Sequence, residues 1–467
     1  MGSVAGALSA GKGRNVTAGT ATAVATSLAL GIAVSRMPHP ELLIIAMGLL
    51  GLVAAVIVRF GKLGLPLLLL VVTPLIPVVS GVYGQPRSYA GIDGSTIRTF
   101  GVATLAAVAA LIAGQGAAVQ RSRLVLVRGV LLALAAVGLV AAVFTSVDSA
   151  DFLKLASQSA GQPILYALML TIFVGLLSSD GETEEKLLSA WCLATIGEGL
   201  IVAAQLGTGA AYDPLRGITR AQGTMGADAL GAFALFGIFG AISLYRHAST
   251  RRGRQLAIVA AVAGMGTLFA SLSRGPVIAL GVALAVLIVT RRPTALHGRR
   301  IAGVLLLVTL AAASIYLTHG LWERRLGAST TAGFDRPATW VGGLRLVEDH
   351  PAVGVGATHM IEVITFSSRY SDTSFGVNGA VPHNAWLFVT AANGVTYGIL
   401  LVILTVALIS AIAQKKRQAE DHYLTVGLIA VGVVFFVNNL FNHPEIMLYV
   451  VLALSVLTST RRPGASS

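Results

Sequence analysis

A histidine stands at the start of a hydrophobic stretch near the C-terminal end of the chain, in AVPHNAWLFVTAANGVTYG (residues 380–398). Pro382 precedes His383, and Asn384 follows it. Because an imidazole titrates close to neutral pH, it can take a proton from a hydroxyl group. We interpret His383 as a candidate general base, and Asn384 as a side chain that orients it or binds a sugar hydroxyl. The alternative is that this His-Asn pair only caps a helix.

The second candidate group is a set of arginines in the C-terminal half of the chain. They are Arg216, Arg220, Arg274, Arg324, Arg325, Arg336, Arg345 and Arg369. The planar guanidinium group donates two hydrogen bonds to one phosphate and keeps its charge at all relevant pH values. Together these arginines predict a site for an anionic ligand. Individually, each could instead be a solvated loop charge or an anchor to lipid headgroups.

Two of these arginines have contexts that favour a functional role. Arg274 lies in a short turn, ASLSRGPVIAL (270–280), between two hydrophobic segments. A charge at membrane level is costly and usually functional, although a side chain reaching the interface is the alternative. Arg336 starts a helix predicted from Asp335 to His350, where the positive helix pole favours an anion. Arg345 is about half a turn out of phase with Arg336 at about 3.6 residues per turn, so we favour Arg336.

Other familiar catalytic patterns are missing from the sequence. It has no Walker loop and no Ser/His/Asp set, and the His and acidic residues of the longest loop lack metal-ligand spacing. The single cysteine, Cys192, lies in a hydrophobic segment and allows no disulfide within one chain. We therefore expect no metal site, no cofactor and no nucleic-acid partner.

The composition indicates which elements position these residues. Of 467 residues, 55% are hydrophobic and 11% are charged, whereas a soluble protein has about 25% charged residues. Apolar segments close to the roughly 20 residues that cross a bilayer recur along the chain. The sequence predicts an all-α, polytopic transmembrane bundle of about twelve to fourteen spans. The candidate spans are 17–35, 41–58, 63–79, 99–119, 124–145, 162–179, 187–207, 226–245, 255–272, 276–290, 301–319, 383–413, 422–440 and 444–459.

The topology follows from the basic clusters between these spans. YRHASTRRGR (245–254), RRPTALHGRR (291–300), KKR (415–417) and RR (461–462) fall on one side if the spans alternate. That side is the cytoplasm by the positive-inside rule, so both termini are expected there. We predict a bundle of eleven spans at 1–319, an outward-facing loop at 320–382, and C-terminal spans with a cytoplasmic tail at 383–467.

Four segments resemble the O-antigen ligase and O-antigen polymerase superfamily of bacterial membrane glycosyltransferases. The ligase pattern is His, then Asn, Ser or Gln, nine residues, Gly, two residues, then Gly, Thr or Tyr; here it reads His383, Asn384, AWLFVTAAN, Gly394, VT, Tyr397. HPAVGVGATHM (350–360) resembles the family's His-Pro-x-x-Gly-x-Gly segment, and SLSRG (271–275) its Ser-Arg-Gly turn. TRAQGT (219–224) resembles its Arg-x-x-Gly segment, without the Pro-Asn that often follows.

The resemblance implies a metal-independent, inverting glycan transfer at the outer face of the bacterial cytoplasmic membrane. The donor would be an undecaprenyl-diphosphate-linked glycan, and the acceptor a hydroxyl of a glycolipid such as lipid A–core or of another envelope polysaccharide. Arg274, Arg336, Arg220, Arg216 and Arg345 would hold the donor diphosphate. His383 would be the base, and Asn384 and His350 would bind the sugar or the acceptor.

Two other functions remain as alternatives. An O-antigen or capsule polymerase would share the donor arginines and differ only in using a second lipid-linked glycan as acceptor. A glycan transporter or flippase would instead predict charges spread through the spans and an internal repeat. The sequence shows neither feature, so transfer is favoured over transport, and the histidine pattern favours a ligase.

Overall fold

A computed structural model of the chain describes residues 60–75, 88–89, 92–93, 124–177, 181–213, 218–289, 336–367, 369–370, 382–413, 422–441 and 443–458. The chain divides into two compact units, residues 1–65 and 66–467. Of the first unit, the described part holds a 3₁₀ turn, Gly61–Leu63, and the first residues of helix α3.

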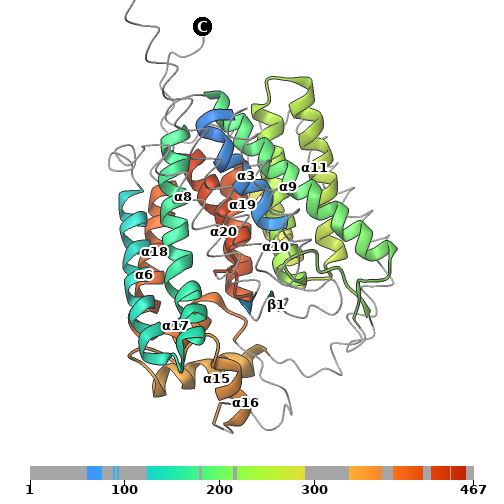
Figure 1. The fold of residues 1–467 in the computed structure, drawn as a ribbon. Helices are drawn as coiled ribbons and strands as arrows, with labels where there is room; N and C mark the ends of the chain where they lie inside the picture. The colour runs from blue at the N-terminus through green and yellow to red at the C-terminus, as the bar shows by residue number, and fades with distance from the viewer. Residues whose placement is uncertain are drawn as a thin grey trace, which may run out of the picture. The chain divides into compact units, whose positions relative to one another are not determined.

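Helices make up nearly all of the described part of the second unit (Figure 1). Its N-terminal half contains α3 (Gly64–Leu75), α6 (Val125–Thr145), α7 (Ser149–Ala156), a π-helical segment (Ser157–Gly161), α8 (Gln162–Leu177), α9 (Gly181–Gly207) and α10 (Ala227–His247). Its C-terminal half contains α11 (Arg251–Ala270), α12 (Arg274–Val289), α15 (Arg336–Asp349), α16 (Met360–Phe366), α17 (Ala385–Asn393), α18 (Val395–Ala413), α19 (His422–Val437) and α20 (Pro444–Thr458). Two short antiparallel hairpins pair β1 (Ser88–Tyr89) with β2 (Ile92–Asp93) and β3 (Tyr212–Asp213) with β4 (Ile218–Thr219).

Helix α10 is the most enclosed of the long apolar helices that the structure describes. It packs against α9, α11, α12, α19 and α20, as expected for a helix that is apolar on every face. Its small residues allow this close packing: a Cβ on Gly240 would lie 2.7 Å from the Trp191 indole of α9. The same indole stacks on Tyr449 of α20, with ring centroids 4.9 Å apart. An aromatic core therefore joins α9, α10 and α20.

A second group of helices is formed by α6, α8, α17 and α18 with the π-helical segment. The buried Tyr166 of α8 ties this group to the turn between α19 and α20, because its hydroxyl donates to the Phe441 carbonyl at 2.8 Å. The outward faces of α6 and α18 are apolar and exposed, for example at Phe144 and Ile409. Such faces suit contact with lipid tails rather than water.

The predicted fold class is confirmed: the chain is an all-α polytopic membrane protein. Six helical segments of the described residues are long and apolar enough to cross a membrane, and four shorter apolar helices accompany them. The long segments are Val125–Thr145, Ser149–Leu177, Glu182–Gly207, Ala227–His247, Arg251–Ala270 and Val395–Ile412. The shorter ones are Gly64–Leu75, Arg274–Leu287, His422–Phe436 and Pro444–Thr458.

The structure corrects one predicted span. Residues 383–413 are not a continuous helix, because α17 and α18 separate at Gly394, whose φ of +87° is outside the helical region. The helix predicted from Asp335 to His350 is confirmed as α15. Predicted spans 17–35, 41–58, 99–119 and 301–319 lie outside the described residues. The total number of spans, the topology and the boundaries at 319 and 382 therefore stay predictions.

Candidate functional site

A buried ion pair brings together two of the segments singled out in the sequence. Arg220, which is 7% exposed, donates from Nη2 to the Asp228 carboxylate at 2.6 Å and from Nε to the Ser271 carbonyl at 2.8 Å. The Ser273 hydroxyl donates to the same Asp228 oxygen at 2.8 Å. These bonds use only part of a guanidinium group that carries five N–H groups. Arg220 is thus fixed in place and can still donate to an anion.

The turn that carries Ser271 and Ser273 is strained. Leu272 has a φ of +49°, the one positive value among the non-glycine residues that the structure describes. Its side chain is fully buried, which holds the turn in this costly conformation. Gly231 of α10 lets the turn approach closely, since a Cβ there would lie 2.9 Å from the Ser271 hydroxyl. Arg274 follows at the first position of α12, half-buried, as expected for a cation at the edge of the bundle.

Two side chains of α9 position the segment that carries Arg220. The amide of Gln205 accepts from the Gly223 backbone at 2.9 Å and donates to its carbonyl at 2.9 Å. About two helical turns earlier, the fully buried Glu198 accepts from the Thr224 hydroxyl at 2.6 Å. Gly223 has a φ of +56°, and a Cβ there would lie 2.4 Å from the Glu198 carboxylate. An ionisable side chain inside a spanning helix is usually functional, and here it shapes the loop beside Arg220.

His383 lies beside this network. It is half-buried, directly before α17, and close enough to Asp228 for their charges to interact. The structure therefore gathers His383, Asp228 and Arg220 at one site, although more than 150 residues separate the first from the other two. A carboxylate near an imidazole stabilises the cation that forms when the imidazole takes a proton.

Asn384 is the N-cap of α17. Its side-chain oxygen accepts from the Leu387 backbone at 3.0 Å, and its amide nitrogen donates to the Phe436 carbonyl of α19 at 3.1 Å. Both ends of the amide are therefore used within the chain, and the capping alternative holds for this residue. Asn384 therefore fixes the start of α17, directly after His383. Its binding of a sugar stays a prediction.

The histidine motif and the segment 350–356 interlock at the break between α17 and α18. Backbone N–H groups of Val355 and Gly356 donate to the last carbonyls of α17 at 3.1 and 2.9 Å, and Val395 donates to Pro351 at 2.8 Å. A Cβ on Gly394 would lie 2.2 Å from the Ala352 carbonyl oxygen, and one on Gly354 would lie 2.4 Å from the backbone of α17. These glycines are needed because two backbones touch there.

The last residue of the histidine motif is also an anchor. Tyr397 is buried, and its hydroxyl donates to the Ser159 carbonyl of the π-helical segment at 3.1 Å. A π-helical turn leaves carbonyls out of the regular ladder, and side chains can satisfy them. Gly394 and Tyr397 therefore hold α17 in place, while His383 is the residue of this motif whose charge interacts with that of Asp228.

This interlock predicts a strong effect of one added methyl group. We expect Gly394→Ala to lower the unfolding free energy by about 2–4 kcal/mol, because alanine both strains this φ and meets the Ala352 carbonyl. The control is Gly432→Ala in α19, where a Cβ would meet nothing within 4 Å. Thermal unfolding of the purified protein in detergent measures both. Equal midpoints for the two variants would contradict the interlock.

The remaining predicted residues lie elsewhere. Arg345 is exposed on α15 and donates to the Arg369 carbonyl at 2.8 Å. Arg369 in turn pairs with Asp349 at 2.5 Å. Burial and a hydrogen bond to the same Asp349 raise the pKa of Tyr370. None of these contacts reaches the network around Arg220, so the structure places Arg345 in a separate cluster on α15.

Three further predicted residues, Arg336, Arg216 and His350, are placed as follows. Arg336 begins α15, where the positive helix pole lies, but its side chain is not among those described. Arg216 lies outside the described residues. His350 is exposed at the end of α15, and its carbonyl accepts from Gly354 at 3.1 Å, so its backbone shapes the interlocking segment. Within the described residues, no three His, Cys, Asp or Glu side chains gather as metal ligands would.

The fold and the site together define a multi-pass helical membrane protein with a charged site built from loop and helix ends. Residues 256–402 match the O-antigen ligase family, which confirms the resemblance to the O-antigen ligase superfamily. The matched segment contains Arg274, α15, the interlocking segment and the histidine motif, and covers less than half of the chain. No curated protein matches the chain. The O-antigen ligase domain indicates a glycosyltransferase-like ligase or polymerase in the inner membrane, with lipid-linked glycan and polysaccharide or lipid partners.

Proposed function

We propose that the protein transfers a glycan from an undecaprenyl-diphosphate-linked donor to an acceptor hydroxyl at the outer face of the cytoplasmic membrane. The observation that carries the proposal is the position of His383 beside the Asp228–Arg220 pair. This arrangement sets a base next to a cation, as transfer from a diphosphate requires. The match to the O-antigen ligase family supports the same reaction class.

In the proposed reaction His383 takes the proton of the acceptor hydroxyl. The acceptor oxygen attacks the anomeric carbon while the bond from that carbon to the diphosphate oxygen breaks. The configuration is thereby inverted, and undecaprenyl diphosphate leaves with the bonding electrons. The imidazolium is then next to Asp228, whose charge stabilises it.

In the proposed reaction, arginine side chains stabilise the negative charge of the leaving diphosphate. Fixed donors stabilise developing negative charge without having to reorganise during the reaction. Arg220 meets this condition because Asp228 and the Ser271 carbonyl hold it. Arg274 begins α12 directly after the same turn, so it can reach the same anion from a second element. Arg336, at the first position of α15, is the third candidate. Asp228 already compensates the charge of Arg220, so Arg274 and Arg336 would compensate the diphosphate while Arg220 adds hydrogen bonds. We therefore expect activity to persist in the presence of a metal chelator.

Reconstitution tests the function and separates its two forms. The purified protein is placed in vesicles with an undecaprenyl-diphosphate-linked glycan and a candidate acceptor such as lipid A–core. One glycan unit transferred to the acceptor identifies a ligase, and a ladder of products on the donor lipid identifies a polymerase. If the donor only moves to the other leaflet of the membrane and no new glycosidic bond forms, the result would contradict glycan transfer and support a flippase. We favour the ligase, because the complete histidine motif is the ligase pattern.

A further inference from the structure

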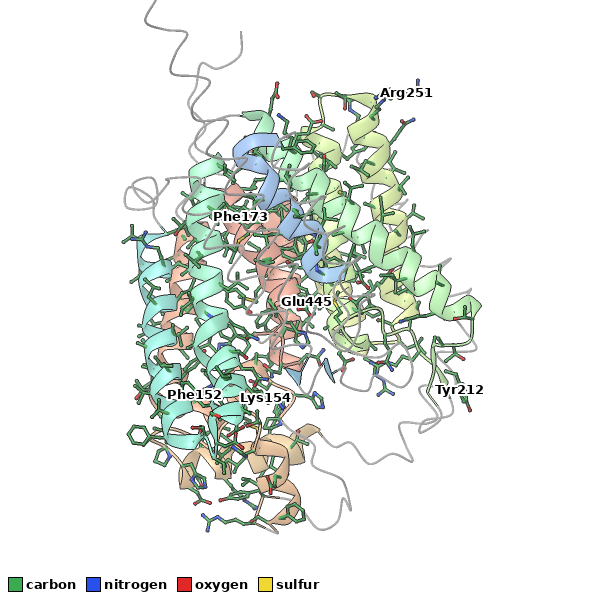
Figure 2. The ribbon with its side chains drawn as sticks, in the orientation of Figure 1. Phe152, Lys154, Phe173, Tyr212, Arg251 and Glu445 are labelled. Atoms are coloured by element: carbon green, nitrogen blue, oxygen red, sulfur yellow. The ribbon has the colours of Figure 1, made fainter. Side chains whose placement is uncertain are left out.

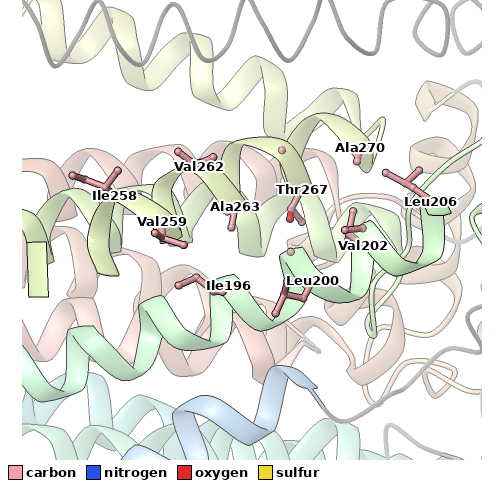
Figure 3. Close-up of a pocket in the computed structure, with 13 residues that line it drawn as sticks. Ile196, Leu200, Val202, Leu206, Ile258, Val259, Val262, Ala263, Thr267 and Ala270 are labelled. Atoms are coloured by element: carbon pink, nitrogen blue, oxygen red, sulfur yellow. The ribbon is translucent and has the colours of Figure 1, made fainter. Parts of the chain in front are cut away.

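An apolar groove runs between the apolar helices α9 and α11 (Figure 3). Its volume is about 480 Å³. Side chains of both helices line it, including Ile196, Leu200, Ala203, Val259, Val262 and Gly266. Thr267 supplies the one hydroxyl group of the lining. Both helices are long and apolar enough to cross a membrane, so the groove is a site for a hydrocarbon rather than for a polar ligand.

Small residues create the space. Helices α9 and α11 are in near contact at Gly199, where a Cβ would lie 3.0 Å from the Ala263 methyl group. One helical turn away from this contact, Gly266 is exposed, and a Cβ there would meet nothing within 4 Å. Larger side chains on either side, such as Leu200 and Val262, form the walls (Figure 3). The shape is therefore a channel open along the bilayer.

One end of the groove meets the segment that carries Arg220. Figure 3 shows Leu206 and Ala270 at that end, and Ile196 and Ile258 toward the other. The Ala270 carbonyl accepts from the Ala221 backbone at 3.0 Å. Gln205, next to Leu206, holds the other side of the same segment. The loop with Arg220 therefore bridges the two helices of the groove at its end.

The direction of α11 shows that the groove end near Arg220 is the end far from the start of α11. Arg251, at the start of α11, lies at the opposite end of the helices from Tyr212, which belongs to the hairpin before Arg220 (Figure 2). The groove thus extends from the charged site along the helices towards the basic start of α11. An amphiphile with an anionic head at Arg220 would lay its tail along this path.

We propose that the groove binds the first part of the polyprenyl chain of the donor. This inference rests on the proposed function, since it assigns the tail of the same lipid-linked substrate. Its basis is the continuity of an apolar channel with the segment of Arg220, together with the length and apolar character of both helices. Bound in this way, the chain sets the position of the diphosphate, so the affinity for the donor depends on chain length.

Gly266→Leu tests the groove, because leucine there fills the channel without meeting the protein. The matched control is Gly281→Leu on α12, where a Cβ is also exposed to open space. Each variant is assayed with one glycan on two donors, one with an undecaprenyl chain and one with a short chain of a single isoprene unit. The short chain ends before it reaches Gly266, which lies one helical turn from Ala270 at the end of the groove near Arg220. We expect Gly266→Leu to raise KM about tenfold for the long-chain donor, which corresponds to about 1.4 kcal/mol of lost apolar burial. The KM of Gly266→Leu for the short-chain donor should stay at the wild-type level. The KM of Gly281→Leu should stay at the wild-type level for both donors.

A second measurement keeps this inference separate from the transfer reaction. Photoactivatable undecaprenyl diphosphate, which carries no glycan, should label residues of α9 and α11 in the wild type, and Gly266→Leu should lose that labelling. Equal labelling in both proteins, or the same change of KM for both donors, would overturn the groove assignment even if transfer is intact. If the protein labels as expected but transfers no glycan, the proposed function fails while the chain-binding groove stands.

Discussion

Replacing His383 with alanine should reduce glycan transfer by about 10²–10⁴-fold, the usual contribution of a general base. The acceptor hydroxyl would keep its proton in the attack, and no neighbouring group of the described site replaces the imidazole: Asp228 is occupied by Arg220 and Ser273. Donor binding should change little, because in the proposed reaction the arginines and not the histidine hold the diphosphate. Turnover and donor affinity, measured on the same reconstituted preparation, separate the two effects.

The neighbouring Asn384 supplies the control for structural damage. Asn384→Ala removes the N-cap of α17 and should lower the unfolding free energy by about 1 kcal/mol. His383→Ala should leave the thermal midpoint near that of the wild type, because His383 precedes the cap. If His383→Ala lowers the midpoint as Asn384→Ala does and turns over near the wild-type rate, the histidine is a structural residue and the assigned base is wrong.

Removing Asp228 should have the second large effect. Asp228→Ala leaves Arg220 buried without its countercharge, and breaking such a pair costs about 3 kcal/mol or more. The Asp228 side chain is 39% exposed, so water offsets part of this cost and the lower end of the range applies. We expect a lower thermal midpoint together with weaker donor binding, because the guanidinium group is no longer held towards the site.

A double variant separates the stability of the pair from its function. Arg220→Met with Asp228→Leu removes both charges, and replacing a buried pair by apolar residues is often neutral for stability. The thermal midpoint should therefore recover. Donor affinity should remain about 10- to 100-fold reduced, as expected when charge-assisted hydrogen bonds worth about 1.5–3 kcal/mol are lost. Wild-type affinity in the double variant would show that the diphosphate is held without Arg220.

The sequence predicted the membrane fold and the main candidates of the site for physical reasons. Long apolar segments, such as those that became α6 and α10, can only be spanning or buried helices. A motif of fixed spacing singled out His383, and a short turn between spans singled out Arg274. These signals are local, so they can be read without knowing which elements meet.

The partners of these residues could not be predicted in the same way. No local sequence pattern marks Asp228, Glu198 or Gln205 as part of the site. Their roles depend on which loop each helix contacts in the folded protein. The break at Gly394 did have a local signal, because Asn393-Gly394 is a common turn dipeptide. The apolar residues on both sides outweighed it, and the predicted span continued through the break.

The interlock at Gly394 has a consequence for how the protein can diversify. Residues 350–356 contact the backbone of α17 directly, so a change in this segment acts on the helix that begins after His383. An exchange of outer loops between relatives would disturb the base if it included this contact. We therefore expect that a change of acceptor preference which alters residues 350–356 also requires a matching change in α17.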